Sequence, residues 1–146
     1  MSTNNQNRYA GDILPNDAWT RLAEDENSVL VDVRTPEEWT YVGVPDISDL
    51  GKECFFVPWL FYPKNNINPN FVHQVLETVK PLDEDTTVLF ICRSGIRSAF
   101  AAQALADMGY NKCFNVAHGF EGDHNKYKHR GRENGWKVDG LPWLQG

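Results

Sequence analysis

Short, largely apolar runs recur along the chain, at residues 28–33, 54–59, 86–91 and 112–116, and the run at 86–91 is rich in β-branched residues. Runs of this length with few polar positions are typical of strands that are buried on both faces of a sheet. Pro58 ends the strand expected in the second run, and Cys113 in the last run is expected to be a small core residue. The pattern therefore predicts four strands.

Between these runs, apolar residues recur every three or four positions, which is the pattern of a helix with one buried face. Helices are predicted at residues 15–24, where Trp19 and Leu22 would lie on one side, and at residues 69–80. A helix is also predicted at residues 120–127. The aromatic stretch at residues 60–67 is predicted to be a loop, either a lid over the core or one wall of an active-site mouth.

The most regular helical pattern spans residues 97–108, and Gly109 would end that helix. Its sheet-facing side would carry five apolar residues: Phe100, Ala101, Ala104, Leu105 and Met108. Strands that alternate with helices in this way imply crossover connections between parallel strands. We therefore expect an α/β domain in which helices flank a central, mostly parallel sheet, with ligands binding at the carboxyl ends of the strands.

A short helix is predicted to begin at Thr35, directly after the strand at residues 28–33. Thr35 followed by Pro36 and then Glu38 is a capping-box pattern, in which the two side chains bond each other's backbone amides. We therefore interpret Glu38 as a structural residue rather than a catalytic one. Asp32 and Arg34, at the end of the same strand, are expected to brace the neighbouring loops through ion pairs and backbone hydrogen bonds.

The turn between the strand at 86–91 and the following helix carries the strongest chemical signal. It reads Cys92-Arg93-Ser94-Gly95-Ile96-Arg97. Backbone amides in such a turn can converge on one point ahead of a helix N-terminus, which favours a thiolate on Cys92. Gly95 permits a backbone angle that a side chain would oppose. The alternative is that Cys92 merely ends a core strand, and the glycine and two arginines in the same turn make that the weaker interpretation.

Several motifs resemble the rhodanese-like sulfurtransferase family, over roughly residues 12–143. The family's active-site loop is resembled by residues 92–98, which read Cys92-Arg93-Ser94-Gly95-Ile96-Arg97-Ser98. The family's second signature is resembled by the Asp-x-Arg at residues 32–34 together with the acidic-aromatic pair at residues 38–39. Val116 followed by Gly119-Phe120, and the closing Gly140-Leu141-Pro142-Trp143, also fit. The stretch at residues 42–47 departs from the family pattern, because the usual histidine and second glycine are absent.

The resemblance implies a three-layer rhodanese-like fold and a catalytic Cys92. The residues implied to bind substrate are Arg93, Ser94, Gly95, Ile96, Arg97 and Ser98, with Asp32 and Arg34 in support. The thiolate would take a sulfane sulfur from a small anionic donor such as thiosulfate and pass it to cyanide or a thiol acceptor. This chemistry needs no metal and no cofactor. The two arginines favour a doubly charged donor, with Arg97 as its main contact.

Two other functions fit parts of the same pattern. A non-catalytic persulfide carrier or a redox-sensing module would need the same activated thiol. A cysteine-dependent phosphatase of the related fold would have one more residue between cysteine and arginine than the four found between Cys92 and Arg97. That shorter ring of amides leaves too few donors for the equatorial oxygens of a phosphate, so phosphatase activity is the weakest of the three alternatives.

Composition and charge narrow the remaining possibilities. A chain of 146 residues fits one domain, expected at residues 12–146 after a flexible tail at residues 1–11. The net charge of −6 argues against nucleic-acid binding, and no apolar run is long enough for a membrane span. Three cysteines without metal-ligand spacing, and the absence of a secretory signal, predict a cytoplasmic protein with reduced thiols.

One surface segment departs from the acidic character of the chain. Four cations lie close together near the C-terminus, at Lys126, Lys128, Arg130 and Arg132. A run of like charges is usually a solvated surface, which is the interpretation that we favour. The alternative is a docking site for an acidic protein partner.

Overall fold

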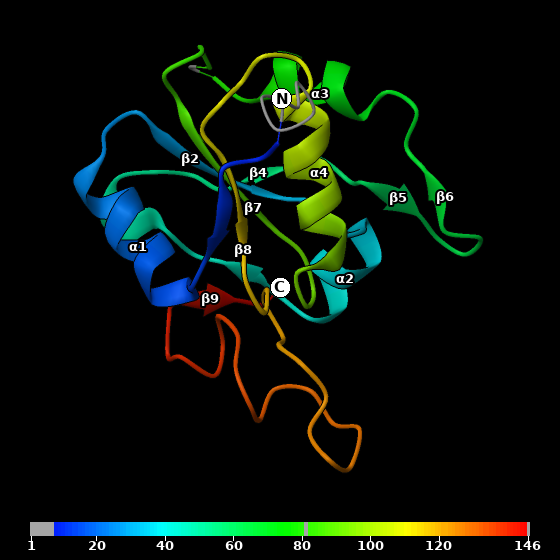
Figure 1. Cartoon of the computed structure of the whole chain (residues 1–146). Coiled ribbons are helices and arrows are strands. Elements are labelled where there is room, and N and C mark those ends of the chain that lie inside the picture. The colour runs from blue at the N-terminus through cyan, green and yellow to red at the C-terminus, as the bar shows by residue number, and fades with distance from the viewer. Residues whose placement is uncertain (1–7, 81, 146) are drawn as a thin grey trace, which may run out of the picture.

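The structure, a computed structural model, describes residues 8–80 and 82–145, and its centre is a five-stranded sheet (Figure 1). The strands, in spatial order, are β1 (Gly11–Ile13), β8 (Cys113–Val116), β7 (Thr87–Ile91), β2 (Ser28–Asp32) and β4 (Phe55–Phe56). Every neighbouring pair is parallel. All five carboxyl ends therefore lie at the same edge of the sheet.

Alternating side chains of the strands bury both faces of the sheet under helices. Val29, Val31 and Phe90 belong to one core cluster, which also holds residues of α3 (Phe71–Thr78) and α4 (Ile96–Ala106). Leu30 and Leu89 point the other way, into a cluster that includes residues of α1 (Pro15–Glu24). The predicted α/β architecture with a central sheet between helical layers is confirmed. The remaining helix is α2 (Pro36–Tyr41), with a 3₁₀ turn at Ser48–Leu50.

Two small antiparallel pairs complete the fold. β3 (Val44–Pro45) pairs with β9 (Trp143–Leu144), which fastens the C-terminal segment to the body. Trp136 in that segment is fully buried, and its ring N–H donates to the carbonyl of Pro142 at 2.7 Å. β5 (Leu60–Phe61) pairs with β6 (Asn66–Ile67) in a hairpin that projects from the body (Figure 1). The stretch at residues 60–67, predicted to be a loop, is therefore a hairpin.

The sequence did not predict β1, and the chain is ordered before residue 12. The backbone N–H of Ala10 donates to the carbonyl of Cys113 at 2.7 Å, and Gly11 begins β1. Residues 1–7 of the predicted tail lie outside the described residues. No helix within residues 8–80 and 82–145 combines the length and apolar character needed to cross a membrane.

Two predictions about helices were wrong. Residues 120–127 form turns, because Gly122 has a φ of 83° and the backbone N–H groups of Glu121 and Gly122 bond to the carbonyl of Arg93 rather than within a helix. Phe100 in α4, and Met108 just beyond the end of α4, do not face the sheet, since their exposed fractions are 61% and 58%. The buried residues of α4 are small except for Leu105, which lets the helix lie close to the sheet: Ser98, Ala101, Ala102, Leu105 and Ala106.

Candidate active site

The sharp turn between β7 and α4 places Cys92 at the carboxyl edge of the sheet. Ile91 ends β7 and Ile96 begins α4, so residues 92–95 make the whole connection. Gly95 caps the helix with a φ of 105°, and a Cβ there would lie 3.3 Å from the backbone nitrogen of His118. A side chain at this position would therefore meet both backbone strain and crowding.

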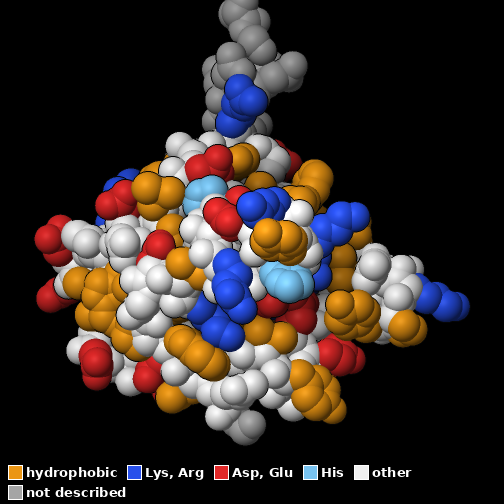
Figure 2. Space-filling view, turned by 90° about the horizontal axis from the view of Figure 1, so that it is seen from below, with side chains coloured by type: hydrophobic (Ala, Val, Ile, Leu, Met, Phe, Trp, Pro, Cys, Tyr) orange, Lys and Arg blue, Asp and Glu red, His pale blue; other side chains and the backbone are white. Residues whose placement is uncertain are grey.

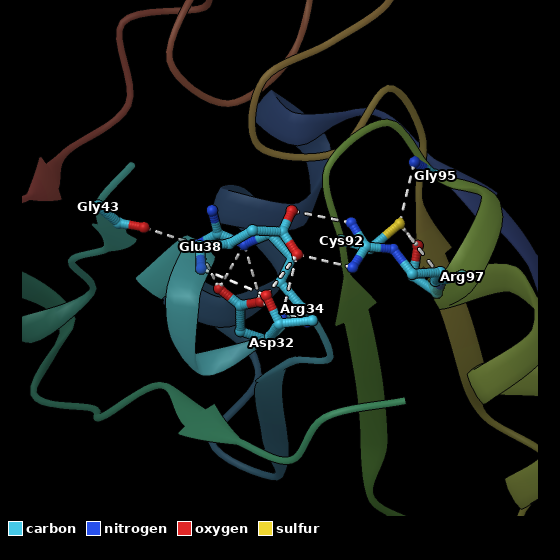
Figure 3. Close-up of polar contacts among 9 residues, drawn as sticks. Asp32, Arg34, Glu38, Gly43, Cys92, Gly95 and Arg97 are labelled. Carbon is cyan, nitrogen blue, oxygen red and sulfur yellow. Dashed lines mark hydrogen bonds and ion pairs between the residues drawn. The ribbon is translucent and has the colours of Figure 1, made fainter. Parts of the chain in front are cut away.

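Hydrogen-bond donors converge on the sulfur of Cys92 (Figure 3). The backbone N–H of Gly95 lies 3.2 Å from Sγ, the backbone N–H of Ser98 lies 3.3 Å away, and the Ser98 hydroxyl lies 3.1 Å away. The two amides belong to the first turn of α4, where unpaired N–H groups carry partial positive charge. The arrangement favours negative charge on the sulfur.

The hydroxyl of Ser98 belongs to a chain of polar contacts that leads away from the sulfur. Ser98 Oγ lies 2.5 Å from Oδ1 of Asn115 on β8, and Nδ2 of Asn115 donates to the carboxylate of Asp12 on β1 at 3.0 Å. Ser98 and Asn115 are both buried. These polar contacts could not be predicted from the sequence, since Asn115 and Asp12 are distant from Cys92 along the polypeptide and match none of the motifs.

Cys92 lies at the floor of a pocket of about 310 Å³. One wall is the active-site loop, and the other is the β5–β6 hairpin, which contributes Leu60, Tyr62 and Asn65. Of the two roles considered for residues 60–67, the structure shows the pocket wall, and Tyr62 is 48% exposed rather than part of a core lid. Cys92 itself is only 1% exposed, so a reactant must enter the pocket to reach the sulfur.

The residues predicted to bind substrate divide into two sets. Arg93, Ser94, Ile96 and Arg97 line the pocket with Cys92. Gly95 and Ser98 do not line it and instead direct their amides at the sulfur. Asp32 and Arg34, expected in support, also lie outside the pocket lining.

Arg97 makes a two-pronged ion pair with Glu38 of α2 (Figure 3). Its two terminal nitrogens lie 2.7 Å and 2.9 Å from the carboxylate oxygens. Burial alone would raise the pKa of Glu38, but the hydrogen bonds and charge of Arg97, together with Thr35, hold that pKa below its ordinary value. The capping box of Thr35 and Glu38 is confirmed, whereas the pairing of Glu38 with Arg97 was not foreseen.

Asp32 and Arg34 form a fully buried ion pair behind the site, with an N–O distance of 2.7 Å. Arg34 also donates to the carbonyl of Gly43 at 2.7 Å, and its guanidinium lies 4.3 Å from the ring centre of Phe120. These contacts join the end of β2 to the segment before β3 and to the turn after β8. The pair therefore holds loops together beneath the pocket.

The loop that follows β8 is hydrogen-bonded to the backbone of the active-site turn. The N–H of Phe120 donates to the carbonyl of Cys92 at 2.8 Å, and the N–H of Glu121 donates to that of Arg93 at 2.9 Å. Gly119 has a φ of 62°, and a Cβ there would overlap the carbonyl of Cys92. Glycine at position 119 thus allows this loop to approach the backbone of the nucleophile candidate closely.

The other two cysteines lie in environments that favour the neutral thiol. Burial raises the pKa of Cys54 well above its ordinary value, and burial raises the pKa of Cys113 to about 12. All three cysteines are free thiols. Among the described residues, no group of three or more His, Cys, Asp or Glu side chains is arranged to hold a metal ion.

Comparisons with known proteins agree with this geometry. Residues 11–146 match the family described as "STR4 middle domain". The crystal structure of Rv0390 from M. tuberculosis is 42% identical, with a TM-score of 0.86 over 94% of this chain and 99% of that one. An uncharacterized protein of Rickettsia prowazekii is 38% identical over 86% of this chain and 90% of its own. The thiosulfate sulfurtransferase GlpE of Actinobacillus pleuropneumoniae is 26% identical over 90% of both chains.

Proposed function

The chain belongs to the STR4 middle-domain family and is a rhodanese-like domain, and on this premise we propose that it is a sulfurtransferase that works through a persulfide on Cys92. The observation that carries the proposal is the convergence of two amides and one hydroxyl on Sγ at the floor of an arginine-lined pocket. The relative named as a thiosulfate sulfurtransferase supports the same class of reaction.

In the first step, the Cys92 thiolate attacks the outer sulfur of thiosulfate. A bond forms between Sγ and that sulfur, and sulfite leaves with the electron pair of the broken sulfur–sulfur bond. The transferred sulfur then projects into the pocket as an anionic persulfide. Oriented amides stabilise the charge in place of water and need no reorganisation during the reaction.

In the second step, cyanide or a thiolate attacks the outer sulfur and carries it away as thiocyanate or a new persulfide. The bond between the two sulfurs breaks, and its electron pair returns to Sγ as the thiolate. The donors at Gly95 and Ser98 stabilise Cys92 as the leaving group in this step. The same contacts therefore serve both halves of the cycle.

Arg93 and Arg97 divide the binding of an anionic donor between them. Arg97 is fixed by Glu38, yet each of its terminal nitrogens has a second N–H for an oxygen of the donor. Arg93 is exposed at the pocket, and no ion pair of its guanidinium occurs within residues 8–80 and 82–145. We therefore assign the orientation of the donor to Arg97 and its electrostatic attraction to Arg93.

Steady-state turnover with thiosulfate and cyanide tests this function and separates an enzyme from a carrier. Thiocyanate should form over many cycles, and Cys92→Ser should abolish it because the nucleophile is lost with little change in volume. Cys54→Ser and Cys113→Ser are the matched controls and should retain most of the activity. A single turnover that then stalls would instead indicate a carrier or redox-sensing module.

A further inference from the structure

The charges around the pocket differ in sign from those of the whole chain. Seven of the 14 Lys and Arg residues, but none of the 20 Asp and Glu residues, lie in three segments of the chain: residues 54–76, 86–106 and 124–132. Lys64 lies in the hairpin, Arg93 and Arg97 lie in the active-site segment, and the other four lie in residues 124–132, which we call the basic loop. The chain as a whole has a net charge of −6.

Topology explains where these charges lie. Residues 92–95 and the basic loop follow β7 and β8, so they belong to the carboxyl edge of the parallel sheet. The acidic residues at 24–26 and 83–85 precede β2 and β7, so they belong to the opposite edge. Figure 2 views the molecule from the side of the carboxyl ends and shows Lys and Arg side chains gathered across the middle of that face.

Backbone contacts join the basic loop to the residue after Cys92. The loop begins and ends beside Glu121 and Gly122, since the N–H of Gly131 donates to Glu121 and the guanidinium of Arg130 donates to Gly122, both at 2.8 Å. Glu121 and Gly122 in turn donate their own N–H groups to the carbonyl of Arg93. The basic loop is thus fixed beside the active-site turn.

Acidic groups close to this face reduce its charge without cancelling it. Glu38 neutralises Arg97, and Asp123 pairs with His118 at 3.2 Å. Glu121 lies at the base of the basic loop, and Glu133 follows its last residue. Apart from Arg97, the cations of these three segments make no ion pair within the described residues: Lys64, Arg93, Lys126, Lys128, Arg130 and Arg132.

Large apolar side chains are also exposed near the start of α4, at Ile96 in the pocket lining and at Phe100 one helical turn further on. Ile96 is 68% exposed and Phe100 is 61% exposed, and the Phe100 ring stacks on Trp59 with 6.4 Å between centres. An inorganic donor would need only the pocket of about 310 Å³ and its arginines. Exposed apolar residues that flank a functional pocket are typical of a surface that binds another macromolecule.

From this combination we infer that the carboxyl-edge face docks an acidic protein that presents a cysteine thiol as the sulfur acceptor. The inference rests on the proposed persulfide chemistry and names its acceptor. Acidic side chains of the partner would face the basic loop, and apolar side chains would pack on Ile96 and Phe100. Because Cys92 is 1% exposed, the accepting cysteine must lie on a protruding segment that enters the pocket.

Designed peptides test the inference through the rate at which they remove sulfur from the persulfidated protein. Each peptide has one cysteine beside a leucine, followed by a tail of Asp and Glu, of Lys and Arg, or of Ser and Gln. At low salt the acidic peptide should react about tenfold faster than the basic one, and added salt should reduce this difference in rate.

The apolar contact is tested separately. Phe100→Ala should slow the reaction of the peptides but not that of a small uncharged thiol.

Two double variants test whether the basic loop causes the faster reaction of the acidic peptide. Lys126→Gln/Lys128→Gln should slow the acidic peptide several-fold and leave the small uncharged thiol unchanged. Lys80→Gln/Lys112→Gln removes the same charge from exposed positions outside the basic face and should have little effect. If all peptides react equally, or if both double variants are equally slow, the docking inference is wrong. If the wild-type protein forms no persulfide, the proposed function fails instead.

Discussion

At the scale of single residues, the hydroxyl hydrogen of Ser98 has two acceptors within reach. Oγ lies 3.1 Å from the Cys92 sulfur and 2.5 Å from Oδ1 of Asn115. The carboxylate of Asp12 accepts from Nδ2 of Asn115, which turns the amide oxygen towards Ser98. A hydroxyl has one hydrogen, so Asn115 competes with the sulfur for it. Asn115 is therefore a positioning residue for the donor set of Cys92.

A double-mutant cycle tests this competition. Asn115→Leu should raise the rate at which iodoacetamide labels Cys92 by about three- to tenfold, because the Ser98 hydrogen is released to the sulfur. In a Ser98→Ala background, Asn115→Leu should have no effect, since it acts through that hydroxyl. Site-resolved mass spectrometry gives the rates. Faster labelling in both backgrounds would mean that Asn115→Leu merely loosens the site.

The sequence predicted the residues of the active-site turn but not their distant partners. Cys92, Gly95 and the two arginines are adjacent in the chain, so their chemistry can be interpreted from local spacing. Glu38 is 59 positions from Arg97, and Asp12 is 103 positions from Asn115. Such pairs depend on how the strands are ordered in the sheet, which a single sequence does not specify.

At the scale of elements, one largely buried ion pair joins α2 to α4 beside the pocket. Glu38 caps α2 and holds Arg97 of α4 in two hydrogen bonds. Both side chains are largely buried, with exposed fractions of 8% and 17%. The carboxylate therefore stabilises the start of one helix and the position of another.

Glu38→Gln should lower the free energy of unfolding by about 1–3 kcal/mol at pH 7, because the amide keeps a cap acceptor but loses the charge. The folded-state pKa of Glu38 lies below the ordinary 4.5. The stability that it contributes is therefore present above that value and is lost as the pH falls through the lower folded pKa. Urea unfolding of both proteins at stepped pH measures this. If the difference in unfolding free energy between the two proteins stays constant at acidic pH, the charge of Glu38 makes no contribution to stability.

Element prediction succeeded at most of the continuous apolar patterns and at the capping box that begins α2, but the apolar run at residues 54–59 forms only the two-residue strand β4. The strands at β2, β7 and β8 and the helices α1, α3 and α4 were predicted within a few residues. β1 was missed because Gly11–Ile13 has only three residues and includes an aspartate. The helix predicted at residues 120–127 did not form because tertiary hydrogen bonds to the active-site turn replaced helical ones.

At the scale of the whole molecule, a parallel sheet separates the ends of its strands into two functional edges. The carboxyl edge holds the nucleophile candidate, the hairpin wall and the basic loop. The amino edge holds the acidic turns at residues 24–26 and 83–85. The net charge of −6 does not reveal this separation of positive and negative side chains. The separation becomes visible only when the strand order is known. The fold thus concentrates positive charge at the edge that carries the pocket.

The central claim is that Cys92 carries the transferred sulfur, and intact-protein mass spectrometry tests it most directly. The protein is incubated with thiosulfate, desalted and weighed before and after cyanide is added, with peptide mapping to find the modified cysteine. The account predicts one added sulfur atom on Cys92, its removal by cyanide, and no addition in Cys92→Ser. A protein that gains no sulfur, or gains it on Cys54 or Cys113, would contradict the account.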